Sequence, residues 1–187
     1  MFRSRSGKTV AGRLLIGALV LLIPAIAGCE AGFNAPTLEF HQASSGAHVV
    51  VNGITITNLF VLGAPVGSTL PAGSSASVFL SLFNAGTGND ALVSVAAPGA
   101  AKSVQLSSGT VSIPANSPVN LTGPQPVVVL TGLTKPLTAG MDISVRLDFQ
   151  HAGSVTLMVP VQPQSFYYST YSPAPGSTPV TSSPAAS

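Results

Sequence analysis

Apolar and polar residues alternate over residues 143–150, which is the pattern of a β-strand with one buried face. A three-residue loop, His151-Ala152-Gly153, is expected to return the chain, because Gly153 can adopt the left-handed backbone conformation that such loops need. The expected partners across this hairpin are Val155 with Phe149, Leu157 with Leu147 and Val159 with Val145. The same register predicts that Met158 lies beside Arg146 and faces outward.

A second hairpin is indicated near residue 50, where Asn52-Gly53 separates two apolar runs. This pair favours the positive φ angles of a two-residue type I′ turn. The expected pairs are Val51 with Ile54 and Val49 with Ile56, all on one face. His48 then lies opposite Thr57 on the polar face.

Further short segments have the composition of strands, and helical periodicity is almost absent. These segments are residues 77–83, 91–96, 103–106, 110–113, 118–121 and 127–131, separated by clusters of Gly, Pro, Asn and Asp. Many short strands with turn signals at this spacing predict an all-β sandwich or barrel.

The N-terminus has the pattern of a lipoprotein signal peptide over residues 1–28. Four basic residues precede an apolar run that is too short for a comfortable membrane span, and Ile26-Ala27-Gly28-Cys29 forms a lipobox. Cys29 is the only cysteine, and its thiol is the group that a lipid donor can alkylate. We therefore predict cleavage before Cys29 and membrane attachment through this lipidated residue, at the outer face of the plasma membrane.

Removal of the leader changes the charge balance of the chain. The remaining chain has three basic and five acidic residues, so its formal charge is −2. Nucleic acid is therefore not an expected partner. Residues 29–47 read as a tether and residues 48–162 as the β-sandwich domain. The Pro-, Ser- and Thr-rich segment 163–187 is predicted to be a disordered tail.

The residues of the mature chain do not suggest catalysis. Gly73-Ser74-Ser75 and Ser107-Ser108-Gly109 both lack the Gly-x-Ser-x-Gly frame of a nucleophilic serine. Asp142 and Asp148 would be about 20 Å apart on one extended strand. The sequence also lacks a phosphate-binding glycine loop with its lysine and the Cys or His spacing of a zinc site. We expect a protein that is not an enzyme.

An ordered series of segments in the middle of the chain carries a family resemblance. The segments are Leu82–Gly86, Asp90–Pro98, Ser103–Leu106, Ile113–Ala115, Leu130–Asp142, Phe149–Gly153 and Val159–Val161. Their order resembles that of the periplasmic copper chaperone family PCu(A)C, over roughly residues 54–162, and in particular its lipid-anchored actinobacterial branch, including mycobacterial lipoproteins. The resemblance implies a cupredoxin-like fold, so the predicted fold class is an all-β, cupredoxin-like or immunoglobulin-like antiparallel β-sandwich.

The resemblance also implies where copper would bind. Copper-binding members hold Cu(I) with a His and a Met from the middle of the domain and with a His-x-Met in the strand before a Gly-Leu-x-x-Pro-Leu motif. Here that strand reads Val127-Val128-Val129, and the segment between Leu106 and Ile113 contains only Ser, Gly, Thr and Val. No metal ligand carries over, and we predict no cofactor. His151 and Met158, with His48 or Met141, would be the only substitutes outside the tether, which contains His41.

Three hypotheses follow for the function. The first is a lipid-anchored, non-enzymatic binding or scaffold domain of the cell envelope, whose partner is an unidentified envelope protein or wall polymer. The second is a copper chaperone or copper-tolerance protein with noncanonical ligands such as His151 and Met158. The third is a wall-associated structural or adhesion lipoprotein that uses its tail.

Overall fold

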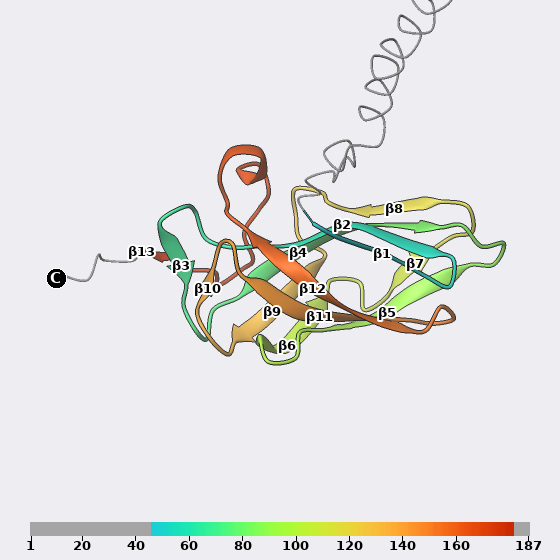
Figure 1. Ribbon diagram of the computed structural model, residues 1–187, viewed down its shortest axis with the longest axis horizontal. Coiled ribbons are helices and arrows are strands. Elements are labelled where there is room, and N and C mark those ends of the chain that lie inside the picture. The colour runs from blue at the N-terminus through green and yellow to red at the C-terminus, as the bar shows by residue number, and fades with distance from the viewer. Residues whose placement is uncertain (1–45, 182–187) are drawn as a thin grey trace, which may run out of the picture. The chain divides into compact units, whose positions relative to one another are not determined.

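Strands and their turns account for nearly all of the regular structure. The computed structural model describes residues 46–181 (Figure 1). A 10-stranded sheet has the order β6-β9-β4-β2-β12-β11-β5-β7, with β1 beside β2 and β8 beside β4. Its strands are β1 (Ala47–Val51), β2 (Ile54–Leu62), β4 (Ala76–Asn84), β5 (Asp90–Ala96), β6 (Ala101–Leu106), β7 (Val111–Ile113), β8 (Pro118–Leu121), β9 (Val128–Leu133), β11 (Asp142–Phe149) and β12 (Ser154–Gln162).

The large sheet forms two layers that meet where β2 and β12 run parallel. Val161 pairs with Val61 at this junction, and the other pairings within the two layers are antiparallel. Inward side chains of both layers form the core, among them Ile56, Leu80 and Leu147, each 0% exposed. The predicted all-β sandwich is confirmed, and each of the six further predicted segments overlaps a strand.

A small second sheet was not predicted from the sequence. It has the order β10-β3-β13 and contains β3 (Ser68–Leu70), β10 (Leu137–Thr138) and β13 (Val180–Thr181). Strands of two or three residues are too short to show a hydrophobic alternation, so the pattern could not reveal them.

The N-terminal hairpin follows the prediction closely. Asn52 and Gly53 have φ angles of 42° and 87°, as a type I′ turn requires. Val51 pairs with Ile54 and Val49 with Ile56, and His48 is exposed as expected. The predicted pair of His48 with Thr57 does not form, because the register shifts between Ala47 and Val49.

The register predicted for the hairpin of β11 and β12 is wrong by two residues. Val145 pairs with Leu157 and Leu147 with Val155, so the turn between the strands is longer than three residues. Since a shift of two keeps every side chain on its face, Met158 still points outward and is 63% exposed, but it lies opposite Ser144. Gly153 has a φ of 87°, as predicted.

A β-bulge at Asn58 changes which face of β2 is buried in the core. Between the pairs Val49–Ile56 and Ala47–Leu59, one residue of β1 faces two of β2, and the pairing with β4 shifts at the same place. Asn58 has a φ of 51°, a backbone conformation that asparagine tolerates better than most residues. As a result, Ile54 and Ile56 face the sandwich core before the bulge, whereas Leu59 and Val61 face it afterwards.

Phe60 and Leu62, which the bulge turns outward, form a second hydrophobic cluster with Phe79 on the same face of β4. Phe60, Leu62 and Phe79 are each at most 2% exposed, although they lie on the outer face of β2 and β4. Tyr168 and Tyr171, from the chain beyond β12, pack against them. The C-terminal segment therefore completes the burial of this end of the sandwich.

The prediction of a disordered tail over residues 163–187 is wrong for its described part, residues 163–181. Ser172 N donates to the Pro124 carbonyl at 3.1 Å, the Ser77 hydroxyl donates to the Ser172 carbonyl at 3.2 Å, and Val180 pairs with Thr69. Burial of aromatic surface offsets the entropy lost on ordering the chain. The predicted leader (residues 1–28), the tether up to residue 45 and residues 182–187 lie outside the described residues.

The packing predicts that Tyr171→Ala lowers the free energy of unfolding by about 2 kcal/mol, because the change removes an aromatic ring from a buried cluster. Tyr167 is 92% exposed, so Tyr167→Ala serves as the matched control and is expected to have almost no effect. Urea unfolding of the full chain measures both variants. Equal effects of the two substitutions would contradict the role given to Tyr171.

Candidate functional site

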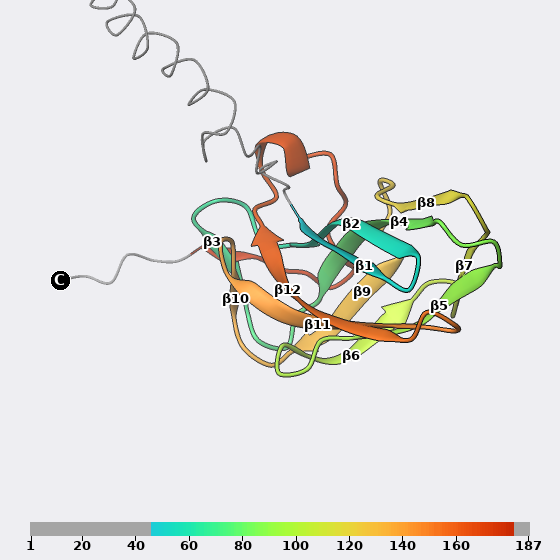
Figure 2. The same ribbon diagram turned by 45° about the vertical axis from the view of Figure 1, so that its right-hand side comes forward.

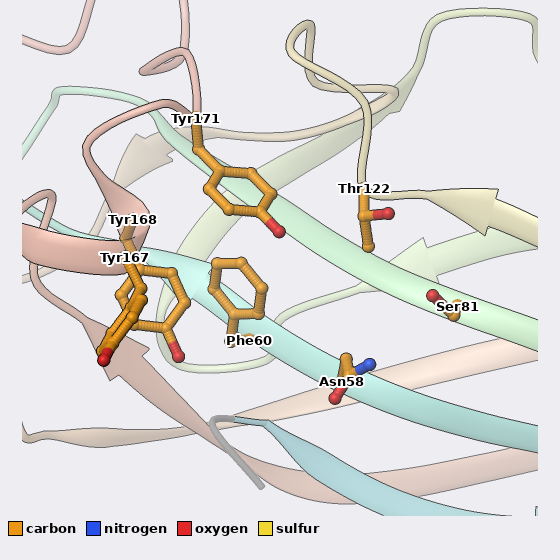
Figure 3. Close-up of a pocket in the computed structure, with 7 residues that line it drawn as sticks. All are labelled: Asn58, Phe60, Ser81, Thr122, Tyr167, Tyr168 and Tyr171. Atoms are coloured by element: carbon orange, nitrogen blue, oxygen red, sulfur yellow. The ribbon is translucent and has the colours of Figure 1, made fainter.

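An uncharged cleft of about 290 Å³ lies between the C-terminal segment and the outer face of β2 and β4. Its lining residues are Asn58, Phe60, Ser81, Thr122, Tyr167, Tyr168 and Tyr171. Figure 3 shows the tyrosines and Phe60 along one side, and Asn58, Ser81 and Thr122 along the other. The cleft thus offers aromatic surface opposite amide and hydroxyl groups.

The aromatic side of the cleft is held by ring contacts. Phe60 stacks on Phe79 with ring centroids 5.4 Å apart, and it meets Tyr168 edge to face at 4.9 Å. Tyr171 meets Phe79 edge to face at 4.7 Å. Such pairs contribute about 0.5–1.5 kcal/mol each beyond the burial of their area, so this wall is preorganised.

A second hollow of about 370 Å³ adjoins the first. Its lining comprises Thr122, Gly123, Pro124, Tyr167, Thr170 and Tyr171, of which three also line the first cleft. Tyr167 and Tyr171 therefore border both hollows, and no charged side chain lines either of them.

The turn that carries Tyr167 presents Phe166 and Tyr167 to solvent, whereas its Tyr168 packs on the second hydrophobic cluster. It contains the 3₁₀ helix η2 (Phe166–Tyr168), in which Phe166 is 83% exposed and has a φ of 54°. A positive φ is unfavourable for a bulky residue. Local hydrogen bonds hold the turn, because Tyr168 N donates to the Ser165 carbonyl at 3.1 Å and the Ser169 hydroxyl donates to the Phe166 carbonyl at 2.7 Å.

A different hollow, of about 370 Å³, lies around Asp90, where the turns of the β1–β2 and β11–β12 hairpins meet the connection from β4 to β5. Asp90 is only 8% exposed. Its carboxylate accepts hydrogen bonds from the backbone N–H groups of Ala91 and His151 at 2.7 and 2.9 Å. It also accepts one from Ala152 N at 2.8 Å, while Asn52 Nδ2 donates to the Ala152 carbonyl at 2.9 Å. These bonds fix the longer turn between β11 and β12, and they explain the register that the sequence did not predict.

The environment of Asp90 lowers the pKa of its carboxyl group. Burial alone raises this pKa, but the three backbone hydrogen bonds and the nearby His151 favour the charged form and outweigh the burial. All of the oxygens' partners are structural groups of the chain. The Asp90 carboxylate therefore fixes the turn between β11 and β12 to the start of β5.

His151 and Met158, the substitute copper ligands, do not share a site. His151 lies in the turn with its Nδ1 atom 3.5 Å from Asp90 Oδ1, whereas Met158 is four residues along β12 from Ser154, or about 13 Å. Met141 Sδ accepts a hydrogen bond from Thr138 N at 3.4 Å in another turn, and His48 lies on β1. Across residues 46–181, no three His, Cys, Asp or Glu side chains are grouped so that they could hold a metal ion.

Cys29, the predicted lipid attachment residue, lies outside the described residues. Within residues 46–181 no helix has the length and apolar character needed to cross a membrane.

Comparison with known families identifies the chain. Residues 54–161 match the family model described as "Putative lipoprotein LpqE-like". The chain belongs to the LpqE-like lipoprotein family. It is 25% identical over 161 residues to the LpqE lipoprotein of Mycobacterium leprae (strain TN), covering 79% of this chain and 86% of the relative.

Solved structures similar to this LpqE-like lipoprotein are PCuAC domains. The copper-bound PCuAC domain from PmoF2 has a TM-score of 0.53 and 22% identity, covering 63% of this chain and 98% of that domain. The apo PCuAC domain from PmoF1 has a TM-score of 0.54 and 20% identity, covering 63% and 99%. These matches confirm the cupredoxin-like β-sandwich and the resemblance to PCu(A)C proteins.

The two segments in which the resemblance implied copper ligands lie side by side in the LpqE-like fold. Ser107 N donates to the Val127 carbonyl at 2.9 Å, and Gln105 of β6 pairs with Val129 of β9. The Ser107 hydroxyl is turned to the carbonyls of Pro126 and Val127 at 3.3 and 3.2 Å. The two segments therefore lie side by side, and the side chains that they bring together are hydroxyl, amide and aliphatic.

Sequence reasoning missed the tyrosine cleft because it treated residues 163–187 as a tail. One signal was present: residues 166, 167, 168 and 171 are all aromatic, whereas disordered segments contain few aromatic residues. What the sequence could not show is the outward-facing Phe60 and Phe79 that these tyrosines cover.

The hydrogen bonds of Asp90 predict a pH-dependent stability. Because the folded-state pKa is lowered, the stabilisation is complete above the unfolded-state pKa, about 3.9, and is lost as the pH falls through the folded-state value. We expect Asp90→Asn to destabilise the protein by about 1–3 kcal/mol at pH 7. Urea unfolding at pH 7 and at pH 3 tests this, and the difference between the proteins should shrink at the lower pH. A difference that is the same at both values would refute the role of the charge.

Proposed function

We propose that this LpqE-like protein is exported, anchored at the outer face of the plasma membrane through lipidated Cys29, and acts as a non-enzymatic binding or scaffold module for another component of the cell envelope. The observation that carries the binding role is the uncharged tyrosine-walled cleft. Aromatic faces opposite amide and hydroxyl groups suit recognition of a neutral partner. A wall polymer or an uncharged surface of an envelope protein has this character.

The arrangement of the carboxylates supports a role without catalysis. Asp90 accepts three backbone hydrogen bonds, and Asp148 accepts from Arg146 Nε at 2.7 Å and from the Ser94 hydroxyl at 2.9 Å. Neither carboxylate lines the tyrosine cleft. General acid–base catalysis requires such a group within hydrogen-bond reach of a bound substrate.

Anchoring through Cys29 is supported by the lipobox and by membership in a lipoprotein family. A single acyl chain holds a protein only marginally, since each buried methylene contributes about 0.8 kcal/mol, whereas two or more chains hold it durably. The diacylated or triacylated cysteine of a bacterial lipoprotein meets this requirement.

We expect Cys29→Ser to move the protein from the detergent phase to the aqueous phase in a detergent phase-separation assay, because the substitution removes the thiol that carries the lipid. Mass spectrometry of the wild-type N-terminus is the accompanying measurement. A wild-type protein with a free thiol or an intact leader would refute the anchor.

Loss of the ordinary copper site is part of this proposal. The facing segments carry Val127, Val129 and Ser107, and neither imidazole nor thioether groups, which Cu(I) prefers. Copper delivery with noncanonical ligands is the alternative suggested by the PCuAC-like fold. The alternative of a wall-associated structural or adhesion lipoprotein relied on a free C-terminal tail. Residues 163–181 instead pack on the sandwich, so this argument for it no longer applies.

An anaerobic Cu(I) titration of the full chain distinguishes loss of the copper site from copper delivery with noncanonical ligands. We expect no tight stoichiometric binding, because no three His, Cys, Asp or Glu side chains are grouped among residues 46–181, and His151 and Met158 do not share a site. Tight binding would overturn the loss of copper chemistry. The double variant His151→Ala, Met158→Ala then assigns the ligands, since an unchanged affinity would exclude these two residues.

A further inference from the structure

The described chain begins at the same end of the sandwich as the exposed aromatic turn. Gly46 packs so closely on the bulge that a Cβ atom added to it would lie 2.5 Å from the carbonyl carbon of Asn58. Asn58 in turn lines the cleft together with Tyr167 and Tyr168. In both ribbon views the start of β1 lies near the orange-red turn that follows β12 (Figures 1 and 2).

This turn carries the most exposed aromatic side chains of the described residues. Phe166 and Tyr167 are 83% and 92% exposed and adjacent in sequence. The backbone of Phe166 has a positive φ, which is unfavourable for this residue type, yet the ring contributes nothing to the hydrophobic clusters. An exposed aromatic pair on a strained turn that does not serve packing indicates a contact outside the chain.

The segment between Cys29 and the domain is long enough for this end of the sandwich to reach the membrane. Its length alone does not determine how the domain is oriented on the bilayer. Residues 29–46 would span at most about 60 Å when extended. A tether of this length keeps the domain at a high local concentration next to the bilayer, so a weak additional contact is enough to orient it.

We propose that Phe166 and Tyr167 form a membrane-docking turn that inserts into the headgroup region of the bilayer and holds the sandwich with its N-terminal end towards the membrane. The inference rests on the proposed lipid anchor at Cys29. Aromatic side chains favour the membrane–water interface. Since no charged residue lines the hollows beside the turn, the contact is apolar and aromatic, and it does not require anionic lipids.

The experiment uses a single fluorescent label on the full lipoprotein. Cys29 is the only cysteine and carries the lipid, so Thr170→Cys introduces a unique thiol in the turn without removing either aromatic residue. Val93→Cys is the matched site, because Val93 is 38% exposed on β5, which lies away from the turn in both ribbon views (Figures 1 and 2). Both proteins are reconstituted into phosphatidylcholine vesicles that contain a headgroup-depth lipid quencher.

We expect the label at residue 170 to be quenched about threefold more strongly than the label at residue 93, and raised salt to leave this difference unchanged. The double variant Phe166→Asn, Tyr167→Ser should reduce quenching at residue 170 to the level at residue 93. Asparagine tolerates the positive φ at position 166, so this variant should keep its urea unfolding midpoint. Phe83→Thr, at another exposed phenylalanine, is the matched control and should leave quenching unchanged.

The outcomes separate the docking turn from the anchor. Vesicle-bound, lipidated protein whose residue 170 is quenched no more than residue 93 overturns the docking turn and leaves the anchor intact. Quenching that survives the double variant also overturns it. Labels at residue 170 that are shielded in cells but unquenched in vesicles would mean that a protein covers the turn, which again contradicts membrane docking. Protein that carries a free Cys29 thiol and does not float with vesicles refutes both proposals.

Discussion

The bulge at Asn58 is the constraint on which the N-terminal end of the sandwich depends. One extra residue in β2 reverses the inward and outward positions, so that Leu59 and Val61 enter the core while Phe60 and Leu62 face away from it. Large apolar side chains on an outer face must be covered, because their exposure would cost about 1.5–3 kcal/mol each. The C-terminal segment supplies the cover with Tyr168 and Tyr171.

The two ends of the sandwich are closed by different interactions. At one end, aromatic rings pack over the bulge and leave an uncharged cleft beside them. At the other, the Asp90 carboxylate joins the start of β5 to the turn between β11 and β12, and the Asn52 side chain joins the β1–β2 turn to that same turn. The second arrangement uses a charge for structure, whereas the first leaves polar and aromatic groups accessible. This difference explains why the cleft, rather than the Asp90 hollow, is the better candidate for a binding surface.

The LpqE-like chain shares the fold of PCuAC domains. Ser107 and Val127 meet through a backbone hydrogen bond. Side chains at such positions can change without loss of the fold, because the strands are held by backbone bonds and by the core beneath them. Fold similarity therefore does not transfer a metal site, and the binding role proposed for this protein rests on its own tyrosine cleft.

Local patterns determined the elements of this protein, and only the tertiary structure decided how they close into a site. The Asn52-Gly53 turn, the alternation in β11 and the outward side of Met158 were all readable, because turn chemistry and strand parity act over a few residues. The register of β11 with β12 depends on Asp90, which is about 60 residues away in the chain. The order of residues 163–181 depends on Phe60 and Phe79 on the outer face of the sheet. Phe60 faces outward because of the bulge in β2, and Phe79 does so by the regular alternation of β4. A disordered tail and a covering segment can have the same composition, and the difference lies in whether a distant surface exists for the aromatic side chains to bury.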